Sequence, residues 1–441
     1  MKPIVRWIAV LGCPFGSLLG TGTAMAQKSG GVLKIYHRDS PASMSILEEG
    51  TNSTEIPMMG VFNNLVMYDQ HVAQNSLSSI VPDLATDWST SEDGTQLTFH
   101  LHKGVKWHDG QPFTAKDVKC SWDLLTGKAS EPLLDGIEYR IIPNRSTAVL
   151  AFIAGQFDMT FPYEVSIPLL KDIKTQAPHA ICDLAPGNAS TNLIVNRDKP
   201  PFDNPEIRRA MMLSLDRKAF IDILAEGQGD IGGAMQPPPA GIWGIPPELL
   251  KTVPGYDPDV GNNRAQARAI MEKLGYGPDN RLKLTVSARN IPIFRDPAII
   301  LIDQLKEIYV DGTLDPVETA NWFPKVARKD YQIGQNNTGS GVDDPDQQFY
   351  ENYACGSERN YTGYCNPELE KQFVQQSTEA NQETRRQLVW EIDKKLQEDG
   401  ARPIIYHFRA ATCWQPQLKG LTIMVNSQYN GWRMEDWWLD R

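Results

Sequence analysis

Three histidines lie close together, at His100, His102 and His108, in the stretch "LTFHLHKGVKWHD". Side chains at alternate strand positions project from one face, so the first two imidazoles could ligate a metal ion together. A zinc site needs further ligands that are oriented by surrounding hydrogen bonds, and no cysteine or acidic residue stands at ligand spacing. We therefore expect two histidines on a solvated strand face, and no metal site.

Carboxylates cluster in "GSGVDDPDQQFY", where Asp343, Asp344 and Asp346 follow a glycine-rich turn. Only Asp344 and Asp346 have the spacing of a calcium-binding EF loop, and the rest of that loop is missing. The same residues are typical of an Asx-type turn that caps a helix. A binding role and this structural role both stay open at the level of sequence.

Catalytic signatures are absent from the chain, which contains no G-x-S-x-G, H-E-x-x-H, G-x-x-x-x-G-K-[ST] or C-x-x-C motif. The glycine-rich "GSGVDD" lacks the strand and helix spacing of a phosphate cradle. We therefore expect no enzymatic activity and no cofactor, and keep a secreted hydrolase as an alternative.

The first residues read as an export signal. Lys2 and Arg6 precede an apolar run that ends near Leu19, and "TAMAQ" provides a small-x-small cleavage site after Ala26. Cys13 mimics a lipoprotein box, although cleavage there would leave a very short apolar core. No later stretch is long and apolar enough for a membrane helix. The net charge of −11 argues against nucleic acid or an anionic membrane surface as a partner.

Five cysteines follow the signal, and an exported chain meets an oxidising compartment in which cysteines pair. Cys355 and Cys365 flank the polar, turn-rich "GSERNYTGY", and closing this loop would add about 3 kcal/mol by the chain-entropy model. Cys182 with Cys413 is our second expected pair, which leaves Cys120 over. The alternative is five reduced and buried thiols.

Local signals around the histidines predict well-defined elements. Leu97, Phe99 and Leu101 alternate with polar residues as in a half-buried strand. Asp-Gly pairs, at Gly94 and at Gly110, predict tight turns because they accept positive φ. Thr114 and Asp117 then form a capping box that opens a helix with Val118, Trp122 and Leu125 on one face.

The whole stretch from Val81 to Val118, "VPDLATDWSTSEDGTQLTFHLHKGVKWHDGQPFTAKDV", resembles the signature region of the family 5 extracytoplasmic solute-binding proteins. These are the dipeptide-, oligopeptide- and nickel-binding receptors of ABC importers. Further blocks, in the same order as in that family, are "VFNNLVMYD", "AGQFDMTF" and "NRDKPPFDNPEIRRAMMLSLDRKAFIDIL". The last block also predicts a helix from its residues, since Asn204 can cap it and Pro205 suits its first position.

The resemblance implies an α/β fold of two lobes, the type II periplasmic-binding-protein fold of the family 5 cluster. After the signal peptide, residues 1–26, we expect lobe I at 27–60, 134–235 and 405–441, and lobe II at 236–404. The strands that cross between the lobes would lie near Gly232–Pro239 and Arg402–Tyr406. Helix, strand and helix in succession over 263–308 independently indicate an α/β lobe.

The pattern of the family breaks between "SWDLLTGKASE" and "PLLDGIEYRII". The resemblance implies a longer segment here, with a strand that crosses the lobes, so residues 61–133 would be the remnant of a truncated small domain. A sheet without its partner strands exposes edges that invite aggregation.

The resemblance also implies a role for the acidic cluster, because the peptide receptors use a carboxylate in this region to pair with the α-ammonium group of the peptide. The upstream acid that some receptors use falls near Ser340 or Gly341 in this chain. Trp322 and Trp243 are further candidates, as aromatic clamps on the ligand, with core packing as their alternative.

We therefore expect the periplasmic substrate-binding component of an ABC importer. It would act as a monomer, close its lobes over a di- or oligopeptide and deliver it to a membrane permease. Another cargo, namely a metal chelate, an opine or an oligosaccharide, is the alternative within this class. A non-functional truncated copy is a further one.

Overall fold

The computed structural model describes residues 33–39, 43, 45, 51–72, 77–91, 96–125, 140–142, 144–423 and 437–440. The turn expected at Gly94, the signal segment and residues 126–139 around the break in the pattern lie outside these ranges. Among the described residues, no helix is long and apolar enough to cross a membrane.

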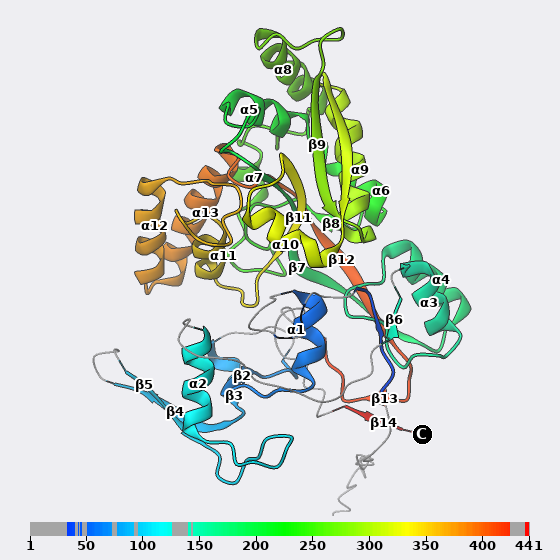
Figure 1. Ribbon diagram of the computed structural model, residues 1–441, viewed down its shortest axis with the longest axis vertical. Helices are drawn as coiled ribbons and strands as arrows, with labels where there is room; N and C mark the ends of the chain where they lie inside the picture. Colours follow the sequence, from blue (N-terminus) through cyan, green and yellow to red (C-terminus); the bar gives the residue numbers. More distant parts are fainter. Residues whose placement is uncertain are drawn as a thin grey trace, which may run out of the picture.

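A six-stranded mixed sheet organises the molecule (Figure 1), and its strand order is β10-β9-β11-β7-β12-β8. β9 runs parallel to β10 and β11, whereas β7 is antiparallel to both β11 and β12. The strands are β7 (Ile181–Val195), β8 (Gly229–Asp230), β9 (Leu282–Arg289), β10 (Val310–Val317), β11 (Ile333–Gly339) and β12 (Ile404–Trp414). β9 confirms the strand of the helix, strand and helix expected over 263–308, and in it Leu282 and Leu284 alternate with Lys283 and Thr285.

The upper body in Figure 1 packs helices around β9, β10 and β11. Asn204 caps α5 by accepting from the Glu206 amide at 2.9 Å, and Pro205 occupies the first turn, as predicted. The helices near β9 are α5 (Pro205–Ser214), α6 (Arg217–Ala225), α8 (Val260–Lys273) and α9 (Pro292–Lys306). A second group comprises α7 (Pro247–Leu250), α10 (Thr319–Ala327), α11 (Pro345–Asn352), α12 (Pro367–Thr378) and α13 (Gln382–Glu398).

The lower body holds short strands and helices beside the lower end of β12 (Figure 1). Its elements are β1 (Tyr36–His37), α1 (Asn52–Met59), β6 (Arg140–Ile141), α3 (Arg145–Ile153), α4 (Ile167–Gln176), β13 (Leu418–Lys419) and β14 (Trp438–Leu439). One continuous apolar cluster joins Ile35 and Leu439 of this body to Val286 and Leu301 of the upper body.

A projecting segment, the described part of residues 61–125, extends at the lower left of Figure 1. It contains β2 (Val66–Tyr68), the 3₁₀ helix η1 (Leu77–Ser79), β3 (Ile80–Pro82), β4 (Ala85–Thr90), β5 (Leu97–Leu101) and α2 (Ala115–Leu125). The capping box is confirmed, because Asp117 accepts from the Thr114 amide at 2.6 Å and from its hydroxyl at 2.8 Å. Gly110 has the positive φ, 85°, that its turn requires.

The long strand β7 connects the two bodies. Its first residues pair with the end of β12, where Cys182 lies opposite Cys413, and its last residue, Val195, lies opposite Ile333 of β11. α5 and α6 come after β7 and pack against α8 and α9 of the upper body. These contacts favour a first crossing at β7 rather than near Gly232–Pro239. The second expected crossing falls at the start of β12, and the full division into lobes stays a prediction.

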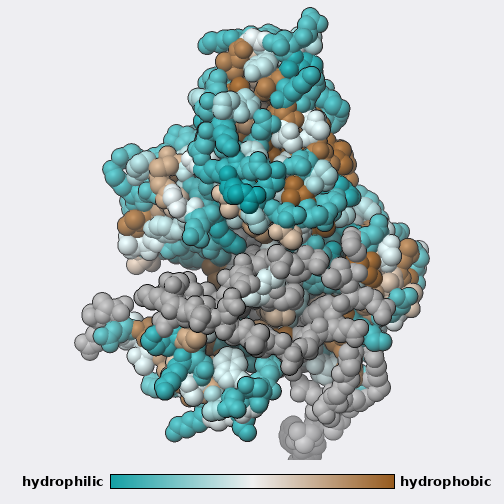
Figure 2. All heavy atoms as spheres, in the orientation of Figure 1, coloured by the Kyte–Doolittle hydropathy of each residue, from teal (hydrophilic) through white to brown (hydrophobic). Residues whose placement is uncertain are grey.

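Two disulfides join parts of this framework. Cys182 is bonded to Cys413 across β7 and β12, and Cys355 is bonded to Cys365 in the turn before α12. Cys120, on α2, is a free and exposed thiol. The surface in Figure 2 is mainly hydrophilic over the upper body, in keeping with the strongly negative chain.

Candidate functional site

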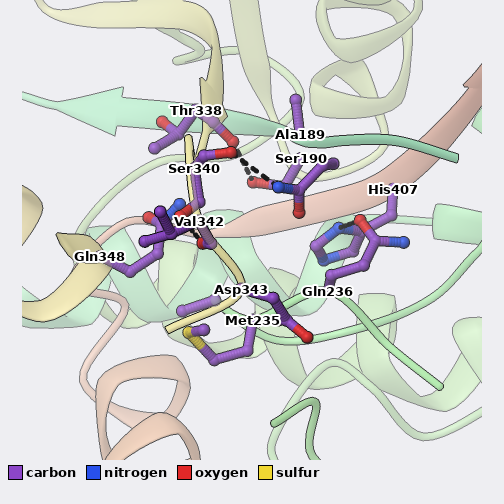
Figure 3. A pocket seen from close by; sticks show the side chains of 12 residues that line it. Ala189, Ser190, Met235, Gln236, Thr338, Ser340, Val342, Asp343, Gln348 and His407 are labelled. Carbon is purple, nitrogen blue, oxygen red and sulfur yellow. Dashed lines mark hydrogen bonds between the residues drawn. The ribbon is translucent and has the colours of Figure 1, made fainter. Parts of the chain in front are cut away.

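A small polar hollow lies where β7, β11, β12 and the segment before α7 meet (Figure 3). Its cavity volume is about 10 Å³, which is room for about one water molecule. We call it the β7–β11 hollow. It is lined by Asn188, Ala189, Ser190, Ala234, Met235, Gln236, Thr338, Ser340, Val342, Asp343, Gln348 and His407.

The register of β7 and β11 places neutral polar side chains on this hollow. Thr338 lies opposite Ser190, and the next pair of the same alternation is Asn336 opposite Asn192. Beyond the strand end, the Asn188 side-chain amide donates to the Ser340 carbonyl at 2.6 Å. The lining is therefore built from hydroxyl and amide groups, which bind uncharged polar atoms as well as ions.

The backbone of β11 is only partly paired on the side that faces β9. β9 pairs only with Ile333 and Gly334 of β11, whereas β7 pairs with β11 along its whole length. From Gln335 to Gly339, the edge of β11 opposite β7 has no strand partner among the described residues. Such an edge can accept an extended chain as an added strand.

Asp343 is the one member of the predicted acidic cluster that lines the hollow. Its Oδ2 accepts from the Ile242 amide at 3.1 Å, and its carbonyl accepts from Trp243 Nε1 at 2.8 Å. Burial raises the pKa of Asp343 to about 6, and the Asp344 carboxylate acts in the same direction. This carboxyl group would gain from a cationic partner at neutral pH.

Asp344 and Asp346 have structural roles. Asp344 caps α11 by accepting from the Asp346 amide at 3.0 Å, and both of its oxygens accept from Arg385, each at 2.8 Å. Asp346 accepts from Gln376 and Ser377 of α12. Their lone pairs are thus used to join α11, α12 and α13, which is the capping alternative stated above.

The two tryptophan candidates lie in apolar clusters. Trp243 is 5% exposed and packs with Phe349 and Phe373, while the Arg385 guanidinium lies 4.8 Å from its ring centroid. Trp322 is 0% exposed and packs with Ile194 and Val326. Neither lines the hollow, so core packing, the alternative stated for both, describes them.

His407 and Gln236 lie beside each other and line one side of the hollow (Figure 3). His407 Nε2 lies 2.9 Å from the Gly233 carbonyl and Nδ1 lies 3.2 Å from Gln236 Oε1. Burial lowers the pKa of His407 to about 4, so the ring is neutral at pH 7 and carries one N–H. With Nε2–H donating to Gly233, Nδ1 accepts best from an amide nitrogen. Gln236 Nε2 has no hydrogen-bond partner among the described residues, and it would supply this donor once the side-chain amide is flipped.

Sequence reasoning missed most of the lining, including Ser190, Gln236, Thr338 and His407. The signal was present as the polar run "GQNNTGSG", which is unusual inside a buried strand. The position of β7 beside it depends on pairing between residues that are far apart in the chain.

The histidines of the projecting segment are candidate metal ligands because of their spacing. His100 Nδ1 lies 2.5 Å from Asp87 Oδ1, and both side chains are largely exposed. Within the described ranges, no group of three or more metal-ligating side chains is found.

The two bodies are held together beside the sheet by a buried ion pair. Asp39, which follows β1, accepts from Arg289 Nη2 at 2.6 Å and from Thr319 Oγ1 at 2.7 Å. Arg289 ends β9 and Thr319 begins α10, so the contact joins the lower body to the upper body. An ion pair that is desolvated in this way is costly to break at one partner only.

A two-bodied α/β fold with a polar hollow at the crossing strands is typical of proteins that bind a small solute. Residues 79–132 and 127–360 match the model of the bacterial extracellular solute-binding proteins, family 5. The chain belongs to this family, whose members bind solutes and are not enzymes.

Relatives by sequence include the periplasmic murein peptide-binding protein MppA of Escherichia coli, which is 21% identical over 536 aligned positions that cover 94% of each chain. The periplasmic oligopeptide-binding protein OppA of Haemophilus influenzae is 25% identical over 66% of this chain. The match with this OppA spans 53% of its length, and the matches with several other curated relatives also span about half of theirs.

Solved structures show the same fold. The Haemophilus influenzae OppA complex with the peptide RPPGFSPFR has a TM-score of 0.79 at 17% identity, covering 94% of this chain and 100% of that one. Escherichia coli MppA also has a TM-score of 0.79, at 18% identity, covering 94% and 99%. The predicted two-lobed family 5 fold is thereby confirmed.

Proposed function

We propose that this protein captures short peptides in the periplasm and delivers them to the permease of an ABC importer. The observation that carries the proposal is the edge of β11 without a strand partner among the described residues, which ends at the β7–β11 hollow and its partly buried Asp343. An extended peptide added along Gln335–Gly339 would hydrogen-bond through its backbone, whatever its side chains. The names of the relatives, MppA and OppA, support peptide as the cargo.

Asp343 suits the amino terminus of such a peptide. Because burial holds its pKa near 6, the carboxylate is ionised at pH 7 but poorly solvated. An α-ammonium group would supply the missing counter-charge and several hydrogen-bond donors. Asp344 and Asp346 cannot replace it while Arg385, Gln376 and Ser377 occupy their oxygens.

The proposal also covers the cellular location of the protein and its partner in the membrane. The signal peptide would be cleaved after Ala26, and the mature chain would act as a monomer that docks on the permease through its two lobes. The family membership and the periplasmic relatives support this location.

Calorimetry with trialanine and N-acetyl-trialanine tests the role of Asp343. The unmodified chain should bind trialanine at least about 10-fold more tightly than the acetylated peptide, which has no ammonium group. Asp343→Asn should bind the two peptides about equally. Asp279→Asn changes an exposed aspartate between α8 and β9 and should behave as the unmodified chain. Failure of a di- and tripeptide library to bind or to raise the melting temperature would contradict peptide capture.

An oligosaccharide is the second candidate cargo. Half of the residues that line the hollow carry neutral amides or hydroxyls, which also suit sugar hydroxyl groups. A periplasmic alpha-galactoside-binding protein of Rhizobium meliloti is 54% identical over 43 residues, which are 10% of this chain. A rise in melting temperature with raffinose, and with no peptide, would favour this cargo.

We also propose that this chain lacks an internal segment of the family fold between Glu131 and Pro132. The family model matches in two pieces that overlap at residues 127–132, as expected if the sequence between them is missing. The alignment with MppA needs 536 positions, although this chain has 441 residues. β4 and β5 pair only with each other among the described strands. A truncated copy without function would show no ligand-induced shift with any cargo and a poorly cooperative melt.

A further inference from the structure

A buried cation, the guanidinium group of Arg402, contacts Thr338 of the hollow. Arg402 is 1% exposed, and no carboxylate within the described residues forms an ion pair with it. Its Nη1 donates to Thr338 Oγ1 at 2.9 Å and to Asn352 Oδ1 at 2.7 Å, and its Nη2 donates to the Arg359 carbonyl at 2.9 Å. A guanidinium group keeps its charge in proteins, so this positive charge is stabilised by neutral oxygens and by the rings of Tyr353 and Tyr361, whose centroids lie 5.8 Å and 6.0 Å from Cζ.

Thr338 is the residue between this charge and the hollow. Its hydroxyl oxygen accepts from Arg402 at 2.9 Å and, more weakly, from Asn336 Nδ2 at 3.4 Å. A hydroxyl oxygen has two lone pairs, and both are used here, so its hydrogen is left to donate. No acceptor for this hydrogen is found in the described part of the chain, and Thr338 lines the hollow (Figure 3).

We infer that the Thr338 hydroxyl donates a hydrogen bond to an oxygen of the cargo, and that Arg402 positions and polarises this donor. The cargo group that enters the hollow therefore carries a carbonyl or carboxylate oxygen. The inference rests on the proposed function, since it assigns a further contact to the same cargo.

The geometry of the hollow narrows the choice of group. Asp343 and Thr338 line the same hollow, so their side chains can serve neighbouring atoms of one cargo molecule. In the first residue of a peptide, the ammonium nitrogen and the carbonyl oxygen are separated by only two carbon atoms. A peptide whose ammonium group faces Asp343 thus brings its first carbonyl oxygen toward Thr338.

A set of Thr338 variants separates donation from packing. Thr338→Val keeps the shape of the side chain and removes the donor, and Thr338→Ser keeps the donor. Calorimetry with trialanine should show an affinity loss of about 10- to 100-fold for Thr338→Val and less than about 3-fold for Thr338→Ser. Thr313→Val makes the same chemical change at an exposed position of β10 and should leave the affinity unchanged.

The positioning role of Arg402 is tested by a double-mutant cycle, because loss of the acceptor in Thr338→Val also removes a bond from a buried cation. Arg402→Met should weaken trialanine binding about 10-fold, and Thr338→Val combined with Arg402→Met should weaken it no more than the stronger single variant. Circular dichroism at the calorimetry temperature verifies that each variant is folded.

Three outcomes separate the role of Thr338, the role of Arg402 and peptide capture itself. Unaltered trialanine affinity in folded Thr338→Val, or in the folded double variant if the single variant does not fold, would overturn the inference and leave peptide capture intact. Affinity losses that simply multiply in the double variant would overturn the role of Arg402. Absence of peptide binding by the unmodified chain would overturn the proposed function and this inference with it.

Discussion

The upper body and the projecting segment contain the same local devices but differ in burial. Both have capped helices, paired antiparallel strands and tryptophans on amphipathic helices. In the upper body Trp322 is 0% exposed, whereas Trp122 of α2 is 57% exposed and Leu97 of β5 is 56% exposed. β7 belongs to a six-stranded sheet, whereas β4 and β5 form a sheet of two strands.

The difference shows that capping and turn signals shape an element without giving it a core. The apolar face of α2 and the inner face of β5 are present in the sequence, yet Trp122 and Leu97 both remain more than half exposed. A two-stranded sheet is only marginally stable by itself. We therefore expect the projecting segment to contribute little to the global free energy of unfolding.

The largest expected effect comes from the two tryptophans. Trp322→Ala should lower the free energy of unfolding by about 3–5 kcal/mol, because it leaves a cavity in a closed cluster. Trp122→Ala should change it by less than about 0.5 kcal/mol, as expected for an exposed side chain. Urea unfolding followed by far-UV circular dichroism measures both. Equal losses in the two variants would show that the projecting segment has a packed core of its own.

Much of the fold was predictable because its signals are local. The cap at Asn204, the capping box at Thr114, the turn at Gly110 and the alternation of β9 each lie within a few residues. The family pattern then supplied the two-lobed architecture, which no local signal contains.

The candidate site was less predictable because its decisive contacts are distant in sequence. Asp343, Asp344 and Asp346 have the same side chain, and only their partners distinguish them. The partner of Asp344, Arg385, stands on α13, and the partner of Asp343, Ile242, precedes α7. Thr338 acquires its role from Arg402 in the same way. No spacing rule reports such pairs, which depend on how β7, β11 and β12 are arranged.

A second comparison uses two carboxyl groups whose pKa values shift in opposite directions. Burial raises the pKa of Asp393, on α13, to about 6, whereas hydrogen bonds from Thr86 and His100 lower the pKa of the exposed Asp87. A raised pKa means that the folded state binds the proton more tightly, so stability falls as the pH rises from about 4 to about 6. A lowered pKa has the opposite effect. The stability that the ionised Asp87 contributes is therefore lost as the pH falls.

Asp393→Asn should remove the decrease in the free energy of unfolding that the raised pKa causes as the pH rises. The free energy of unfolding of this variant, relative to the unmodified chain, should therefore rise by about 2–3 kcal/mol between pH 4 and pH 7. A constant loss from the changed hydrogen bonds to Ala234 and Met235 would not alter this slope. Asp87→Asn is the matched control and should show no rise. Urea titrations at four pH values measure the difference, and parallel curves for all three proteins would contradict the prediction.

The smallest expected change in the free energy of unfolding concerns two aspartates, each at the start of a helix. Asp344 caps α11 and forms a bidentate pair with Arg385, so Asp344→Ala should lower the global free energy of unfolding by about 2 kcal/mol. Asp117 has a similar role at α2, through its two hydrogen bonds with Thr114. If α2 opens without the rest of the molecule, Asp117→Ala should leave the global value within about 0.5 kcal/mol of the unmodified chain.

The same variant should still be visible locally. Loss of a capping contact worth about 1 kcal/mol should speed amide hydrogen exchange in Ala115–Leu125 about 5-fold, with exchange in β7 and β12 unchanged. Asp344→Ala should instead accelerate exchange throughout the upper body, because α11 is joined to α12 and α13 by the same carboxylates. If Asp117→Ala lowered the global stability as much as Asp344→Ala does, the two regions would unfold as one unit. The contrast between them would then lie in surface exposure alone and not in cooperativity.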